Sequence, residues 1–271
     1  MMSKNILERG LVMLGCGKMG SALLSGWLEQ GVGPKSVWIL DPKPSKWVIS
    51  CGVRVNEILP DDPAIVLMAV KPQMMGEALL RLQRFGAGTT LFLSVAAGTS
   101  ISTFEKVLGS STPIVRAMPN TPAAVGQGIT ALIGNSRTTD TDLAEAQSLM
   151  AAVGQTVLLQ DESQMDAVTG VSGSGPAYVF HLIETLAQAG VEQGLPAGMA
   201  MRLAKATVVG AGALAVQSDE SAEQLRINVT SPNGTTQAAL EVLMNEKTGL
   251  QPLITQTVAA ATLRSKELSN G

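Results

Sequence analysis

Three closely spaced glycines near the start of the chain place the strongest constraint on its fold. Gly15, Gly17 and Gly20 follow the apolar run 11–14 and open a helical pattern at 21–30. In a strand–turn–helix unit the first glycine permits the tight turn, the second lets the backbone approach a pyrophosphate, and the third lets the helix pack on the strand. The pattern predicts a dinucleotide-binding turn, although a glycine-rich turn without a ligand has the same spacing.

A carboxylate follows the next expected strand. The run 37–40 ends at Asp41, 21 positions after the last glycine of the motif, where dinucleotide folds place an acidic side chain on the ribose diol. A 2′-phosphate would face this carboxylate, which favours NAD over NADP. Lys43, Ser45 and Lys46 could neutralise such a phosphate, so both cofactors stay open. Asp41 also fits a purely turn-forming role.

Hydrophobic periodicity divides the 271 residues into two parts, as expected at about 150 residues per domain. Residues 1–160 alternate short apolar runs with helical patterns, which predicts an α/β Rossmann-type domain with a mostly parallel, doubly wound sheet. The expected strands are 11–14, 37–40, 64–70, 90–95, 114–117, 129–133 and 156–159, and the expected helices are 21–30, 74–85, 101–108 and 140–153.

The remaining residues, 161–271, have helical patterns and no strand signal. The expected helices are 165–193, 197–217, 222–229, 236–245 and 255–268. Glycine in a helix costs about 1 kcal/mol relative to alanine, so the run Gly210–Ala215 needs close packing to compensate. Because so few charges leave more apolar surface than one small bundle hides, we expect this helical domain to pack against another subunit in a homo-oligomer.

Composition excludes several classes of function. Nineteen Lys and Arg against 22 Asp and Glu give a net charge of −3 with no basic block, so nucleic acid is not an expected partner. The single histidine, His181, and two cysteines cannot form a His/Cys zinc site, which needs about four ligands. We expect His181 to be a packed core or interface residue. Without a signal peptide or an unbroken apolar run of about 20 residues, the chain is expected to be cytoplasmic and not bound to membrane.

Two further segments lie where ligands are expected. The expected strand 64–70 runs into Lys71 and Pro72, and the strand 90–95 runs into Ala97, at the sheet edge where open α/β sheets bind ligands. Near the other end of the chain a Pro-Asn-Gly break at 232–234 places Thr235 and Thr236 at a helix start, where free N–H groups and hydroxyls can hold a carboxylate. An ordinary turn with an N-cap threonine fits the same residues.

Five segments, taken together, resemble the pyrroline-5-carboxylate reductase family over residues 10–268. They are the glycine loop 15–20, the Ala-Val-Lys-Pro run 69–72, the Met-Pro-Asn-Thr-Pro run 118–122, the stretch 166–178 and the stretch 228–236. The resemblance implies reduction of 1-pyrroline-5-carboxylate to L-proline, the last step of proline biosynthesis, with hydride from NADPH or NADH. It also implies a helical domain that interlocks in a dimer, and dimers that join into a decamer.

The resemblance also implies roles for individual residues. Thr236 is the expected catalytic hydrogen-bond donor, and the expected substrate contacts are Glu162, Ser231, Thr235 and Thr236. Together with the dinucleotide motif, which supplies the glycines and Asp41, the resemblance gives as expected cofactor contacts Gly15, Cys16, Gly17, Lys18, Met19, Gly20, Asp41, Asn56, Ala69, Val70, Lys71, Pro72, Ala97 and Asn228. No metal is expected. Asp41 departs from the small or basic residues usual in this family.

Three other functions stay open from the residues alone. A β-hydroxyacid dehydrogenase would have a helix lysine with an Asn four residues later. Here the residue four positions after Lys205 is Val209, which disfavours that function. Another imine reductase on the same fold, or a dinucleotide-binding scaffold without activity, is also compatible because fold alone does not determine function.

Overall fold

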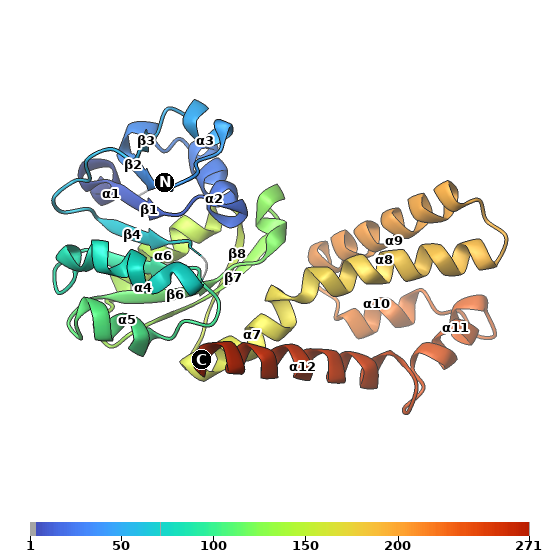
Figure 1. Ribbon diagram of the computed structural model, residues 1–271. Coiled ribbons are helices and arrows are strands. Elements are labelled where there is room, and N and C mark those ends of the chain that lie inside the picture. The colour runs from blue at the N-terminus through green and yellow to red at the C-terminus, as the bar shows by residue number, and fades with distance from the viewer. Residues whose placement is uncertain (1–3, 71, 271) are drawn as a thin grey trace. The chain divides into compact units, whose positions relative to one another are not determined.

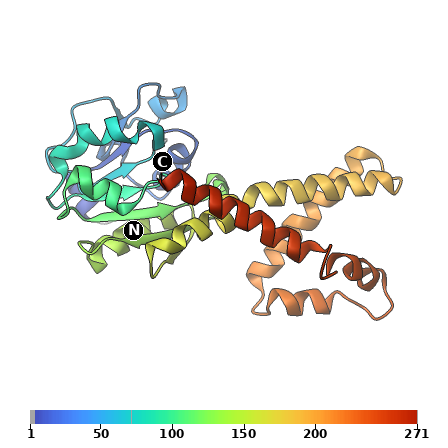
Figure 2. The same ribbon diagram turned by 60° about the horizontal axis from the view of Figure 1, so that its bottom comes forward.

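The computed structural model describes residues 4–70 and 72–270 and contains two compact units (Figures 1 and 2). The first comprises Met1–Gly173 and Ala261–Gly271, and the second comprises Ser174–Ala260. The first unit thus continues past residue 160, where the sequence pattern changes, and includes the end of the last helix. One reason is a hydrogen bond of 2.6 Å from Ser265 Oγ to Asp166 Oδ1, which joins that helix end to the segment after the sheet.

An eight-stranded sheet forms the centre of the first unit. Its strands are β1 (Leu11–Leu14), β2 (Val37–Leu40), β3 (Arg54–Val55), β4 (Ile65–Met68), β5 (Leu91–Ser94), β6 (Ile114–Met118), β7 (Gly128–Gly134) and β8 (Gly154–Leu158). They are arranged in the order β3-β2-β1-β4-β5-β6-β7-β8, and every neighbouring pair is parallel except β6 and β7. The predicted fold class, a mostly parallel doubly wound sheet followed by a helical domain, is confirmed.

Helices cover both faces of this sheet. They are α1 (Lys4–Arg9), α2 (Lys18–Glu29), α3 (Lys46–Ser50), α4 (Pro72–Leu82), α5 (Ile101–Leu108), α6 (Asp140–Ala151) and α7 (Met165–Val168). Alternate strand residues point to opposite faces, so Leu11 and Met13 pack in the core under α2 and α6, whereas Val12 and Leu14 pack in the core under α4 and α5. Trp27 links α2 to α6 through a buried hydrogen bond of 2.9 Å from Nε1 to the Leu149 carbonyl.

The second unit is helical, as predicted. It contains α8 (Gly175–Glu192), α9 (Ala197–Gln217), α10 (Ala222–Asn228), α11 (Thr235–Leu243) and the first part of α12 (Leu250–Asn270). The expected single helix 165–193 is instead divided into α7, a π-helical turn Thr169–Gly173 and α8. Glycines at 170, 173 and 175 and the proline at 176 explain the division, because both residue types weaken a continuous helix.

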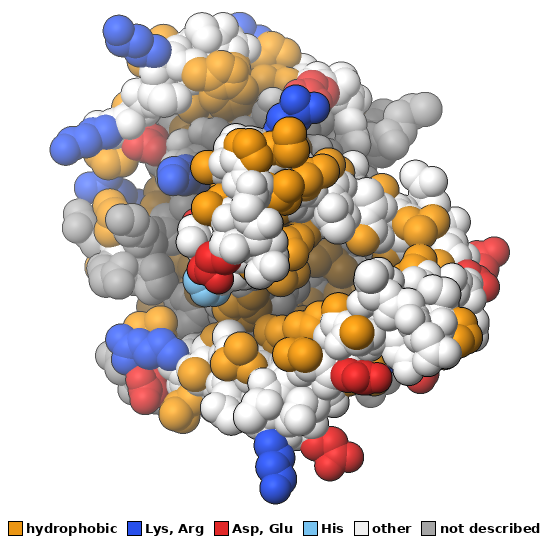
Figure 3. Space-filling model, turned by 90° about the vertical axis from the view of Figure 1, so that its right-hand side faces the viewer, with side chains coloured by type: hydrophobic (Ala, Val, Ile, Leu, Met, Phe, Trp, Pro, Cys, Tyr) orange, Lys and Arg blue, Asp and Glu red, His pale blue; other side chains and the backbone are white. Residues whose placement is uncertain are grey.

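Few side chains of the second unit are buried. Its core cluster consists of Ala187, Ala200 and Ala204, and hydrophobic side chains gather over its exposed helices (Figure 3). Phe180 is 60% exposed and Val209 is 69% exposed. By length and composition alone α9 could cross a membrane, and little of it is buried in the structure. His181 does not pack in a core as expected: its side chain is 75% exposed and faces Glu184 at 3.3 Å. The interface alternative for His181 stays a prediction.

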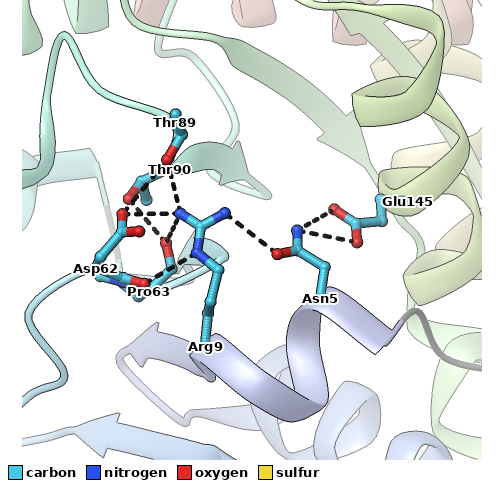
Figure 4. Close-up of polar contacts among 7 residues, drawn as sticks. All are labelled: Asn5, Arg9, Asp62, Pro63, Thr89, Thr90 and Glu145. Atoms are coloured by element: carbon cyan, nitrogen blue, oxygen red, sulfur yellow. Dashed lines mark hydrogen bonds and ion pairs between the residues drawn. The ribbon is translucent and has the colours of Figure 1, made fainter.

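Arg9 connects three segments at the amino-terminal edge of the sheet (Figure 4). Its guanidinium donates to the Asp62 carboxylate and the Thr89 hydroxyl, both at 2.8 Å, and to the Pro63 carbonyl at 3.3 Å. It also donates to Asn5 Oδ1 on α1, and Asn5 in turn donates to Glu145 on α6. The short helix α1 is therefore held by a charge-assisted network as well as by the buried side chain of Ile6.

We predict that Arg9→Met lowers the free energy of unfolding by about 1 kcal/mol, because five hydrogen bonds, two of them partly buried, lose their donor together. Methionine keeps the apolar stem, so the change reports mainly on the guanidinium. Urea unfolding followed by circular dichroism measures the effect. The control is Arg137→Met, which removes an exposed guanidinium with one hydrogen bond of 3.3 Å. Equal losses in the two variants would contradict the role assigned to Arg9.

Candidate active site

The glycine turn between β1 and α2 has the geometry that its sequence predicts. Gly15 has φ +80°, and a Cβ there would lie 2.8 Å from Val70 Cγ1. A Cβ on Gly20 would lie 2.9 Å from the Gly15 carbonyl oxygen, so α2 could not pack as closely with a larger residue. Gly17 is different, because a Cβ there would meet no atom within 4 Å. Open space therefore lies in front of the second glycine, at the N-terminus of α2.

The carboxylate of Asp41 holds this turn against the end of β2. Its Oδ2 accepts a hydrogen bond from the Cys16 N–H at 2.8 Å, and its Oδ1 accepts one from the Lys43 N–H at 2.8 Å. Asn56, which follows β3, fixes the Asp41 backbone: Oδ1 accepts from the Asp41 N–H at 3.1 Å and Nδ2 donates to the Asp41 carbonyl at 2.9 Å. Asn56 itself has φ +53°, a left-handed conformation that Asn tolerates.

A pocket of about 610 Å³ opens beside these residues, a size typical of small-molecule sites. It is lined by Leu14, Leu40, Asp41, Pro42, Asn56, Val70, Met74, Ala78 and Arg81. These residues come from the carboxyl ends of β1, β2 and β4, from the segment after β3 and from α4. The strand order reverses direction between β1 and β4, and open α/β sheets bind ligands at such a point.

Burial makes the thiol inside the glycine turn unreactive. Cys16 is buried, and this burial, with the Asp41 carboxylate nearby, raises the pKa of its thiol to about 11. Cys51, at the end of α3, is less buried, and burial raises the pKa of its thiol as well. Cys16 therefore offers the site its backbone N–H and a packed, protonated side chain, not a nucleophile.

A second group of polar contacts lies beside the loop after β5. The carboxylate of Glu162 accepts from the Ile101 N–H at 2.8 Å, at the first residue of α5, and forms an ion pair with the buried Arg116 of β6. Both contacts use Oε1 of Glu162. The loop that contains Ala97 runs directly into α5, so this ion pair holds the helix that follows the loop. Sequence reasoning missed Arg116, because nothing in the pattern pairs it with a residue 46 positions later.

The predicted substrate loop lies in the second unit. Thr235 is the first residue of α11, and the glycine before it provides no side-chain cap for the helix N–H groups. A Cβ on Gly234 would lie 2.4 Å from Ser231 Oγ, and the Gly234 N–H donates to the Ser231 carbonyl at 3.1 Å. The side chain of Asn228, at the end of α10, donates to Glu220 at 2.9 Å. The loop thus has the tight turn and open helix start that the sequence predicts.

Comparison with known proteins identifies the family. The chain matches the family model for pyrroline-5-carboxylate reductase dimerisation over residues 162–268, and the model described as NADP oxidoreductase, coenzyme F420-dependent, over residues 11–98. It is 37% identical to the pyrroline-5-carboxylate reductase of Pseudomonas aeruginosa, over 96% of each chain. It is 39% identical to that of Synechocystis, over 95% of this chain and 97% of the relative.

The chain belongs to the pyrroline-5-carboxylate reductase family. Solved structures agree: a pyrroline-5-carboxylate reductase from Coxiella burnetii is 34% identical with a TM-score of 0.90, over 96% of this chain and 98% of the other. The Plasmodium falciparum pyrroline carboxylate reductase, solved with NADP bound, is 30% identical with a TM-score of 0.84, over 97% of this chain and 99% of the other. The resemblance in the sequence is thereby confirmed.

The predicted site residues of this reductase divide between the two units. In the first unit the structure gathers Gly15, Cys16, Asp41, Asn56 and Val70 around one pocket and turn. Lys18, Met19 and Gly20 begin α2, Ala69 directly follows β4, and Ala97 and Glu162 lie by the loop before α5. Lys71 and the side chain of Pro72 lie outside what the structure describes. Asn228, Ser231, Thr235 and Thr236 belong to the second unit. Sequence reasoning missed Arg81 and Met74, which line the pocket.

The first unit fits a nicotinamide dinucleotide. The open space at Gly17 leaves room for a pyrophosphate beside the uncapped N-terminus of α2, whose N–H groups and dipole favour phosphate. The neighbouring pocket has the apolar walls and the few polar groups that an adenosine requires. Among the described residues no three His, Cys, Asp or Glu side chains gather as a metal site.

We predict that iodoacetamide at pH 8 alkylates Cys51 at least about tenfold faster than Cys16, because a thiol with a pKa near 11 is only about one part in a thousand thiolate at that pH. Raising the pH toward 11 increases the thiolate fraction of Cys16 and therefore its rate. Mass spectrometry of peptides from a time course gives both rates, and Cys51→Ser serves as the control. Faster labelling of Cys16 at pH 8 would contradict the burial argument.

Proposed function

We propose that the chain reduces 1-pyrroline-5-carboxylate to L-proline with NADPH or NADH, the last step of proline biosynthesis, in the cytoplasm. One observation carries the proposal: a dinucleotide pocket and an uncapped helix start after a Ser-Pro-Asn-Gly turn occur in a chain similar over its whole length to pyrroline-5-carboxylate reductases. A protein with this activity is an oxidoreductase that acts on a carbon–nitrogen bond.

Each half of the reaction has candidate residues. The dinucleotide supplies the hydride when bound. The glycine turn would receive its pyrophosphate, and Asp41 and Asn56 lie where its adenosine ribose belongs. In the second unit the first N–H groups of α11 and the hydroxyls of Ser231 and Thr235 would hold the substrate carboxylate.

The proposed proton chemistry needs little from the protein. A cyclic imine accepts hydride at carbon while its nitrogen is protonated or hydrogen-bonded, and the free imine can arrive already protonated. The hydroxyl of Thr236, one residue into α11, would donate a hydrogen bond to that nitrogen. This role suits a chain whose only histidine is exposed on α8. Glu162 would position the start of α5, whose first N–H it binds, beside the substrate. Its other carboxylate oxygen, Oε2, would be the atom that contacts the substrate directly.

The test of the function is oxidation of NADPH and NADH, followed at 340 nm, with 1-pyrroline-5-carboxylate and with its six-membered homologue. Turnover of the five-membered imine supports the proposal. Protein that binds dinucleotide but turns over neither imine would leave the scaffold alternative, and turnover of the six-membered ring alone would assign another imine reductase.

We predict that Thr236→Ala lowers turnover at least about tenfold while the Kd for the dinucleotide changes less than about twofold, because one hydrogen bond to the reacting nitrogen is lost. Steady-state kinetics and fluorescence titration measure the two quantities. Thr141→Ala, an exposed hydroxyl on α6, is the matched control. Unchanged turnover in a folded Thr236→Ala protein would remove Thr236 from the reaction.

We further propose that two copies interlock through the second unit and that dimers join into a decamer. The dimer is supported by the family that residues 162–268 match and by the apolar side chains that remain exposed on α8 and α9. The decamer is supported by the family resemblance alone.

We predict that Val209→Arg, in the middle of α9, dissociates the dimer or prevents its formation, because a charge would be buried between subunits. Light scattering after size exclusion gives the mass as a multiple of the 28.1 kDa chain. Val125→Arg, which places the same charge on an exposed position of the first unit, is the control. A full-mass oligomer of the Val209→Arg protein would place the subunit contact elsewhere.

A further inference from the structure

We infer that Asp41 makes this reductase prefer NADH to NADPH. Its carboxylate would accept hydrogen bonds from the two hydroxyls of the adenosine ribose and would repel a 2′-phosphate. This preference rests on the function proposed above, because it concerns the nicotinamide cofactor of that same reaction. One family model is described as an NADP oxidoreductase, and one solved relative was determined with NADP bound, so a preference for NADH would distinguish this chain from that relative.

The first argument is the number of acceptor sites that remain on the carboxylate. A carboxylate has about four lone-pair positions. Two of them are used by the N–H groups of Cys16 and Lys43, one on each oxygen. The two that remain, again one on each oxygen, match a pair of adjacent hydroxyl donors. A ribose 2′,3′-diol is such a pair, whereas a 2′-phosphate offers acceptor oxygens where the carboxylate also has only acceptors.

The second argument is that Asp41 cannot easily move away. Its side chain is bonded to two segments, the glycine turn and the start of the following turn. Its N–H and carbonyl are both bonded to the Asn56 amide, at 3.1 and 2.9 Å. A rotation that turned the carboxylate away from a 2′-phosphate would leave the Cys16 N–H without this acceptor and would loosen the turn itself.

The third argument concerns the positive charges nearby. Lys43 and Lys46 have exposed side chains, and a hydrated lysine on a flexible stem offsets a fixed carboxylate poorly. Of the described residues that line the pocket, Arg81 alone is positively charged, and it comes from α4. Met74 and Ala78 lie seven and three positions before Arg81 and therefore share its face of α4. That apolar face suits the adenine ring, which places Arg81 by the base and Asp41 by the ribose.

The experiment measures binding to the purified full chain without any imine, so that its result does not depend on turnover. NADH and NADPH are titrated by their fluorescence at low and at high salt. We expect NADH to bind at least about tenfold more tightly than NADPH at low salt, and the ratio to fall as salt screens the carboxylate. An NADH preference smaller than about tenfold at low salt, or one that salt does not reduce, overturns the inference.

Variants assign the effect to its residue. Asp41→Asn is expected to reduce the ratio of NADH affinity to NADPH affinity at least about fivefold, because NADH binds more weakly and NADPH more tightly. Asp61→Asn, an exposed carboxylate before β4, is the matched control and leaves the ratio unchanged. Arg81→Met is expected to leave the ratio within about twofold. A wild-type preference for NADPH that Arg81→Met removes would assign the 2′-position to Arg81 and overturn the role of Asp41.

A competition experiment guards against an Asp41→Asn protein that does not fold. ADP-ribose and 2′-phospho-ADP-ribose are used to displace NADH from the wild-type chain. The inference requires ADP-ribose to be the stronger competitor, and equal competition contradicts it. Failure of the reductase assay alongside a clear NADH preference would contradict the proposed reaction and leave the cofactor assignment intact.

Discussion

The hydrogen bond from the Cys16 N–H to the Asp41 carboxylate connects the two parts of the first unit on which the pocket depends. Gly15 lets the chain leave β1 in a tight turn, and Asp41 holds that turn against the end of β2. Asn56 then fixes Asp41 from the segment after β3. Three strand ends that are far apart in the sequence thereby form one rigid wall. A wall that is already in place does not lose conformational freedom when a ligand binds.

The second unit follows a different physical rule. Its helices are built from Ala, Gly, Val and Leu, and its own core cluster holds only three alanines. Small side chains allow helices to approach closely, but they remove little apolar surface from water within one copy. A chain of this kind is completed by contact with another copy, which is consistent with the dimerisation family that it matches. Stability and subunit contact are therefore linked in this protein.

Sequence patterns predicted the bounds of some longer elements correctly, joined α7 and α8 into one helix, and missed the shortest elements. The expected bounds 197–217 and 101–108 agree with α9 and α5 in the structure, and the Ser100 side chain caps α5 by accepting from the Thr103 N–H. In contrast α1, α3 and β3 have between two and six residues, too few for a periodic pattern to appear. Contacts with distant segments hold two of these elements. Arg9 of α1 binds Asp62, and Asn56, directly after β3, binds the backbone of Asp41 at the end of β2.

The candidate site was predicted where local chemistry alone defines a residue's task. Gly15, Gly17 and Gly20 could be assigned from their spacing, because each restricts the backbone at its own position. Arg116 and Arg81 could not, since a strand arginine and a helix arginine look like surface residues until the topology brings Glu162 and the pocket to them.

The sequence by itself determined the fold class, the glycine turn, the family and the helix start at Thr235. It left the role of Asp41 open between ribose binding and turn formation. The tertiary structure shows that Asp41 does form the turn, through two backbone N–H groups, and that it keeps acceptor positions beside the pocket. Only the folded chain could decide this, because the donors that orient the carboxylate come from a segment 25 residues earlier and from the turn that follows it.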